Sequence, residues 1–140
     1  MVDRSVVRAK IAFIQVRLHE LKARHRKVTA KQFAKDMDVQ AIILHHFQTA
    51  IQACCDVASH IVADQELGIP SSSAELFEIL AKKKIIPWTL ARRFGDHVRL
   101  RNRIVHGYNK LDFEDIHGTL PNQARSITGF LELIAKYVKL

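Results

Sequence analysis

Cysteine, proline and glycine are scarce in this sequence, with two, three and five residues among 140. The two cysteines, Cys54 and Cys55, are adjacent in a helical pattern and therefore point about 100° apart. This arrangement favours buried small side chains over a disulfide or a metal site. No apolar run approaches the length of a membrane span, and the first ten residues are too charged for a signal peptide. We therefore expect a cytoplasmic protein that does not contact a membrane.

Sustained strand-like alternation, internal repeats and low-complexity tracts are also absent from the sequence. Apolar residues make up 48% and charged residues 26% of the chain, which is the composition of an ordered globular protein. A chain of this length can bury one core but not two, so residues 1–140 are expected to form a single domain.

Apolar residues recur at intervals of three and four along almost the whole chain, which is the spacing of amphipathic helices. The clearest stripes belong to a first helix and to a broad, heavily buried central helix: Val7, Ile11, Ile14, Leu18 and Leu21, then Leu44, Phe47, Ile51, Cys54, Ala58 and Ile61. The sequence therefore predicts an all-α fold, a helical bundle.

Capping residues mark where several helices begin. Thr29 with Gln32, and Ser72 with Glu75, have the spacing of capping boxes. The central helix is expected to end at the Gly-Ile-Pro sequence of residues 68–70. The helix that follows Ser72 should run to roughly residue 83.

Proline and glycine mark the remaining boundaries. A further helix is expected over residues 87–105, with Pro87 in its first turn and Gly107 directly after its end. Asp112 is expected to cap a short helical piece. Pro121 is then expected to open or kink the last helix.

Positive charge is concentrated in one segment of the chain. Residues 82–103 carry eight lysines and arginines and one acid, whereas residues 28–81 carry two and seven. Such a basic segment attracts polyanions such as RNA, or an acidic partner. Charge alone leaves an ordinary solvated helix face equally open.

An arginine interrupts the apolar stripe of the helix over residues 87–105. Phe94, Val98 and Val105 share one face, and Arg101 occupies the missing position in that series. Charged side chains are rarely buried without a partner. Arg101 should therefore reach solvent, pair with a buried acid, or line a cleft.

Two polar residues follow Arg101 on the same helix. Asn102 and His106 are four residues apart and share a helical face, whereas Arg101 and His106 would lie roughly 140° apart on a continuous helix. Two arrangements would let both serve one site. Either the helix ends near His106, where Gly107 supplies a break, or two chains each contribute one of the side chains.

These residue types suit cleavage of RNA by its own 2′-hydroxyl, a reaction that needs no metal. A histidine can move the proton near neutral pH, and an arginine stabilises the charge that builds on the phosphorane oxygens. For His106 alone, an ordinary helix-end histidine is the simpler interpretation. The set of Arg101, Asn102 and His106 favours a catalytic site.

The spacing of Arg101, His106 and Tyr108, with Asn102 after the arginine, resembles the motif of the HEPN superfamily. Within it, the sequence is similar to the HepT-like toxins that are paired with minimal nucleotidyltransferase antitoxins. The segment AIQACCDVASHIVADQELGIPSSSAELFEIL resembles that branch's long second helix, Gly-x-Pro corner and third helix. The resemblance covers roughly residues 5–138.

This resemblance implies a bundle of five to six helices that forms a homodimer, with the two motifs facing one cleft. It also implies a metal-independent endoribonuclease without a cofactor, in which Arg101, Asn102 and His106 are catalytic. Tyr108 is implied as the residue to which the antitoxin transfers AMP. The added bulk and negative charge would then repel RNA.

Further residues are assigned around this motif. Asp56 matches a polar or acidic position on the family's second helix and would supply a partner for Arg101. His60, one turn later, could join them, although an ordinary polar helix face is the preferred interpretation. Arg99 and Arg103 flank the motif and are interpreted as RNA-binding residues that contact phosphate.

Two other functions remain open on the sequence. One is a non-catalytic module that binds nucleotides or serves as the partner subunit of a nucleotidyltransferase. The other is a purely structural helical dimer, which leaves Arg101 unexplained. No metal site is predicted, because ligand spacing is lacking at four further histidines: His45, His46, His97 and His117.

Overall fold

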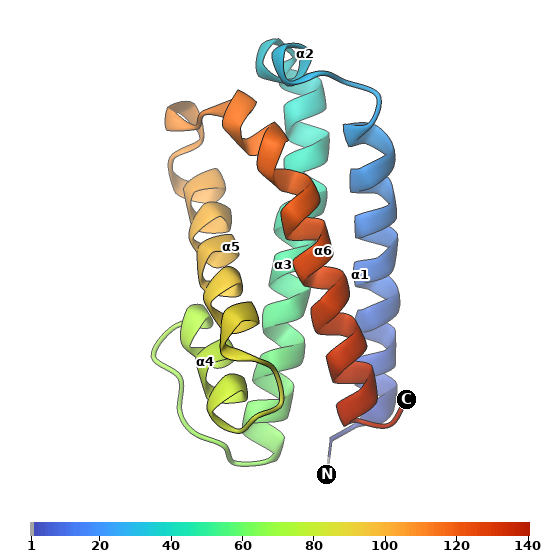
Figure 1. Cartoon of the computed structure of the whole chain (residues 1–140), viewed down its shortest axis with the longest axis vertical. Helices are drawn as coiled ribbons and strands as arrows, with labels where there is room; N and C mark the ends of the chain where they lie inside the picture. Colours follow the sequence, from blue (N-terminus) through green and yellow to red (C-terminus); the bar gives the residue numbers. More distant parts are fainter. Residues whose placement is uncertain (1) are drawn as a thin grey trace.

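The computed structural model describes residues 2–140 and contains six α-helices and one short 3-10 helix (Figure 1). They are α1 (Arg4–His25), α2 (Ala30–Lys35), α3 (Met37–Asp64), α4 (Ser73–Lys82), α5 (Trp88–His106), η1 (Tyr108–Lys110) and α6 (Phe113–Tyr137). Residues 2–140 contain no β-strand. The prediction of an all-α bundle of five to six helices is confirmed. In this part of the chain, no helix is both long and apolar enough to cross a membrane.

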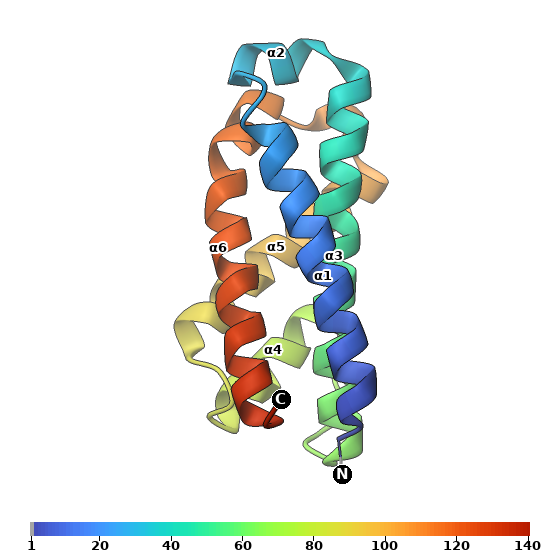
Figure 2. The ribbon, with the colours of Figure 1, turned by 90° about the vertical axis from the view of Figure 1, so that its right-hand side faces the viewer.

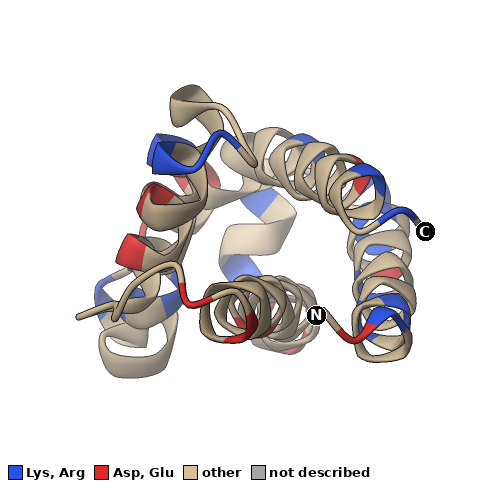
Figure 3. Cartoon of the chain, turned by 90° about the horizontal axis from the view of Figure 1, so that it is seen from below, with Lys and Arg blue, Asp and Glu red and all other residues tan. Residues whose placement is uncertain are grey.

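The long helices run side by side, and α2 crosses the end of the bundle opposite to the chain termini (Figure 1). α1 lies across α3, with α6 beside it (Figure 2). α4 packs on α3 and α5 near the end that holds both termini. Viewed along the bundle from that end, α3 shows acidic residues and no basic ones (Figure 3), in agreement with its sequence, which has no lysine or arginine.

Three buried phenylalanine rings pack together where α4, α5 and α6 meet, and they hold α5 in place. Phe77 of α4 stacks on Phe94 of α5 with ring centroids 4.4 Å apart, and Phe130 of α6 lies 5.0 Å from Phe94. All three side chains are fully buried. Offset and edge-on packing of this kind is favourable beyond the apolar area that it buries. It fixes the helix that carries the candidate site.

Side-chain caps set several helix starts, with two differences from expectation. Thr29 forms the predicted capping box, but α2 is short, and Asp36 then accepts two backbone N–H groups to start α3 as a separate helix. Ser72 caps α4 by accepting the N–H of Glu75 at 3.2 Å. The Glu75 carboxylate binds Ser71 and not Ser72, so this box is only half formed.

Pro121 lies inside α6, so the short piece expected after Asp112 and the last helix are one continuous helix. A proline lacks an N–H and leaves the carbonyl four residues earlier without its helical partner. That carbonyl belongs to His117, and the ring Nε2 of His25 donates a hydrogen bond to it at 2.7 Å. The last residue of α1 therefore supplies the bond that Pro121 removes.

Candidate active site

The buried face of α5 turns as the helix proceeds. Phe94 and Val98 are buried as expected, but Val105 is 50% exposed, so the predicted stripe fails at its last member. Residues seven apart drift around an α-helix by about 20°, and Ile104 takes the core position in the last turn. Arg101 lies at the edge of the buried face and is itself half-buried.

The Arg101 side chain reaches from α5 to α3. Its Nη1 donates to Oε1 of Gln52 at 2.5 Å, and its Nε and Nη2 donate to Oδ1 of Asn102 at 3.3 and 3.0 Å. Its Nη1 also lies 4.0 Å from Sγ of Cys55. These neutral partners fix the direction of the guanidinium and leave its positive charge available to an anion.

Asp56 does not pair with Arg101, which corrects the expectation from the sequence. Its carboxylate is bound by Nζ of Lys10 at 3.1 Å and by Nε2 of Gln52 at 3.1 Å. Gln52 therefore stands between Asp56 and Arg101 and binds both. Asp56 has this partner because α1 packs along α3. That packing brings Lys10 of α1 to the carboxylate, and its ammonium group neutralises the acid.

His60 does not join Arg101 either. Its Nε2 accepts the backbone N–H of Asp3 at 3.2 Å, directly before the start of α1. It lies one turn beyond Asp56 in the direction of the chain termini. The structure therefore places it at the junction of α1 and α3, outside the candidate site.

Arg101, Asn102 and His106 line one pocket of about 290 Å³ between α3 and α5. The other lining residues are Gln48, Thr49, Gln52 and Val105, so no acid faces the pocket. α5 ends at His106, and Gly107 caps it by donating its N–H to the backbone carbonyl of Arg103 at 2.7 Å. Of the two arrangements considered for Arg101 and His106, the structure has the one in which the helix ends near His106. One chain brings both residues to the same pocket.

Tyr108 does not line this pocket. Its hydroxyl donates to Oε1 of Gln40 at 3.4 Å, and its ring packs on Phe113 with centroids 5.4 Å apart. Gln40 is buried, and its amide is held by two backbone carbonyls of α2. Partial burial raises the pKa of Tyr108, so the hydroxyl keeps its proton at neutral pH. The bond to Gln40 is long and weak, and the Tyr108 side chain is half-buried.

Arg99 and Arg103 are exposed on a different side of α5 from Arg101. Arg103 follows Arg101 by two positions and so points about 200° away. Arg99 pairs with Asp96 one turn earlier, which offsets part of its charge. Neither of them lines the pocket of Arg101.

The two cysteines are free and buried, as predicted. Burial raises the pKa of Cys55 to about 11, despite the opposing effect of the nearby Arg101. The pKa of Cys54 is raised well above its usual value, also by burial. Neither thiol is ionised at neutral pH, so neither is available as a nucleophile.

The sequence interpretation did not assign Gln48, Thr49 or Gln52 to the site. Gln48, Gln52 and Asp56 are spaced four apart and form a polar stripe beside the buried face of α3. That stripe was the available signal. Within residues 2–140, no group of three or more histidine, cysteine or acidic side chains is placed to hold a metal ion.

Comparison with known proteins shows the family to which the chain belongs. A family profile described as Ribonuclease HepT-like matches residues 14–134. The chain belongs to the HepT-like ribonuclease family.

Two relatives of this HepT-like protein are named nucleases. The mRNA nuclease HepT of Shewanella oneidensis is 32% identical over 103 residues, which are 74% of this chain and 77% of the relative. The tRNA nuclease HepT of Aphanizomenon flos-aquae is 26% identical over 107 residues, covering 76% and 72%.

A solved structure matches the HepT-like fold over nearly its whole length. It is the tri-AMPylated HEPN toxin of Shewanella oneidensis in complex with its MNT antitoxin, with a TM-score of 0.88 and 28% identity. The match covers 96% of this chain and 99% of that toxin. The resemblance to HepT-like HEPN proteins that the motif predicted is therefore confirmed.

Proposed function

We propose that this HepT-like protein is the toxin of a toxin–antitoxin pair and cleaves RNA, without a metal, at the pocket between α3 and α5. The observation that carries the proposal is the placement of Arg101, Asn102 and His106 of one chain on one pocket. The fixed guanidinium, the amide and the exposed imidazole suit cleavage by the RNA's own hydroxyl. Its relatives named as mRNA and tRNA nucleases support this activity.

In the proposed reaction the RNA 2′-oxygen attacks the adjacent phosphorus, and the bond from phosphorus to the next nucleotide's 5′-oxygen breaks. The 2′-oxygen loses a proton and the departing 5′-oxygen gains one, and His106 is the pocket's proton carrier. Arg101, held by Gln52 and Asn102, donates hydrogen bonds to the phosphorane oxygens. The products are a 2′,3′-cyclic phosphate and a 5′-hydroxyl.

The proposal includes two protein partners and a point of control. The partners are a second copy of this chain, with the two pockets facing one cleft, and a nucleotidyltransferase antitoxin. Tyr108 is the proposed acceptor of AMP, and the exposed Arg99 and Arg103 contact the RNA backbone. The matched toxin structure is both AMPylated and bound to its antitoxin, which supports this part of the proposal.

We expect purified wild-type protein to cleave total RNA in EDTA as fast as in magnesium. Arg101→Ala should slow cleavage about a hundredfold, because one group that stabilises the transition state is lost. The measurement is the initial rate of product formation on denaturing gels. Product ends are checked for the 2′,3′-cyclic phosphate.

The matched control is Arg92→Ala, which removes the same charge from an exposed position on the same helix. It should cleave within about twofold of wild type, since a distant surface charge contributes little at moderate salt. Equal rates for Arg101→Ala and wild type would overturn the site assignment. RNA binding by the wild type without any cleavage would favour the alternative, a non-catalytic nucleotide-binding or partner subunit.

A further inference from the structure

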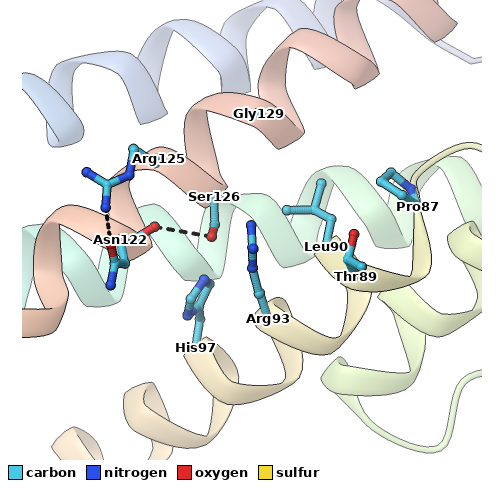
Figure 4. A pocket seen from close by; sticks show the side chains of 9 residues that line it. All are labelled: Pro87, Thr89, Leu90, Arg93, His97, Asn122, Arg125, Ser126 and Gly129. Atoms are coloured by element: carbon cyan, nitrogen blue, oxygen red, sulfur yellow. Dashed lines mark hydrogen bonds between the residues drawn. The ribbon is translucent and has the colours of Figure 1, made fainter.

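A second pocket, of about 650 Å³, lies between α5 and α6. Its lining residues are Pro87, Thr89, Leu90, Arg93, His97, Asn122, Arg125, Ser126 and Gly129 (Figure 4). None of them lines the pocket of Arg101. The volume lies within the range of about 300–1,000 Å³ that is usual for small-molecule sites.

A buried histidine without a protein partner forms part of this pocket. His97 is only 6% exposed, yet no group of the described chain hydrogen-bonds either of its ring nitrogens. Its ring packs edge-on against Phe94, with centroids 5.3 Å apart, and it points toward α6 (Figure 4). A buried polar group without a partner is costly. Such a group facing a cavity therefore indicates a ligand.

Two arginines stand at the same pocket with their charge uncompensated. Arg125 donates a hydrogen bond to the neutral side chain of Asn122, and no acid lines the pocket. Arg93 is exposed and points from α5 in the same direction as His97 (Figure 4). The nearest acid in sequence, Asp96, is paired with Arg99. The pocket is therefore positively charged.

We propose that this pocket binds a small organic phosphate of about nucleotide size, with its phosphate held by Arg93, Arg125 and His97. Guanidinium groups bind phosphate through paired, charge-assisted hydrogen bonds. The apolar side chains of Pro87 and Leu90 lie at the other end of the pocket, where they contact the organic part (Figure 4).

The arrangement fits a phosphate better than a carboxylate. The donors come from two helices, α5 and α6, and a phosphate offers more acceptor oxygens to them than a carboxylate, which has two. Burial lowers the pKa of His97 to about 4, with Arg93 acting in the same direction and Asp96 against it. The neutral ring still donates one N–H to a phosphate oxygen.

The arrangement also fits a small molecule better than an RNA strand. His97 and Ser126 are buried in the pocket, and the Ser126 hydroxyl donates to the backbone carbonyl of Asn122 at 3.2 Å. A strand lying on the surface would reach the exposed arginines but not the imidazole behind them. The phosphate must therefore enter the pocket itself.

The test is a titration of the isotope-labelled protein with uridine 5′-monophosphate, followed by NMR. We expect the largest shifts at the backbone amides and ring of His97 and at Ser126. The double variant Arg93→Gln/Arg125→Gln should bind at least about tenfold more weakly, since each charge-assisted hydrogen bond contributes substantially. Uridine, which lacks the phosphate, should also bind at least about tenfold more weakly.

The matched control is Arg92→Gln/Lys136→Gln, which removes two exposed charges from the same two helices outside the pocket. It should bind within about twofold of wild type. Shifts confined to the pocket of Arg101, or equal binding by both double variants, would overturn the proposal. So would shifts at His97 with a 2′-O-methyl oligoribonucleotide but not with the mononucleotide. RNA cleavage by Arg93→Gln/Arg125→Gln should match wild type, so the test is independent of the proposed ribonuclease activity.

Discussion

Replacing His106 with alanine is expected to slow RNA cleavage about a thousandfold, within the range usual for loss of a general acid or base. His106 is exposed at the end of α5, and its ring has no partner in the described chain that it would have to leave. It is also the only imidazole among the residues that line the pocket of Arg101. The measurement is the single-turnover rate at saturating protein, which separates chemistry from RNA binding.

The control for His106→Ala is His19→Ala, a histidine exposed on α1. It should leave the single-turnover rate within about twofold of wild type, as a substitution away from the site usually does. RNA binding by His106→Ala should also be nearly unchanged, because the lysines and arginines of the chain supply most of the phosphate affinity. A rate for His106→Ala within a few-fold of wild type would remove His106 from the mechanism.

Replacing Tyr108 with phenylalanine is expected to abolish AMP transfer by the cognate antitoxin. The tyrosine oxygen would attack the α-phosphorus of ATP, pyrophosphate would leave, and the phenolic proton would pass to a base. Burial raises the pKa of Tyr108, so this proton must be removed during transfer, and we expect the antitoxin to supply the base. Intact mass spectrometry after incubation with antitoxin and ATP reports each added AMP.

The chain has a second tyrosine that serves as the matched control, Tyr137 near the end of α6. Tyr137→Phe should accept as much AMP as wild type, and its RNA cleavage should be inhibited to the same extent. Tyr108→Phe should cleave RNA near the wild-type rate, because the residue lies outside the pocket of Arg101, and should stay active after incubation. AMP addition to Tyr108→Phe at the wild-type level would contradict the assignment.

Local features of the helices could be predicted from the sequence. The capping box at Thr29 and the end of α5 at Gly107 both follow from spacing within one helix. The helical period determines such relations without reference to the rest of the fold. Pro121 was the exception, because its place inside α6 depends on a hydrogen bond from His25 of another helix.

Contacts between helices could not be predicted in the same way. Asp56 was expected to meet Arg101, but the register of α1 on α3 brings Lys10 to it and leaves Gln52 to bind the arginine. A single sequence does not specify this register, because any acid on the same face of α3 would satisfy the local pattern. The choice between partners is made by packing.

The pocket of His97 shows the same limit. The spacing of His97 from Phe94 places this histidine on the buried face of α5. The sequence interpretation assigned His97 to no site, because it lacks metal-ligand spacing. Its lack of a partner, and the approach of Arg125 from α6, exist only in the folded chain. Unpaired buried groups of this kind become visible only when every neighbour is known.

The central claim is that Arg101 and His106 of the same chain form one active site. Its most direct test co-expresses Arg101→Ala and His106→Ala with different affinity tags and purifies the protein that carries both. Our account predicts that this mixed form of the proposed dimer cleaves RNA no faster than either variant alone, because each of its pockets lacks one residue. Recovery of roughly half of the wild-type rate would mean that one complete site forms across the two-fold interface, and would contradict the account.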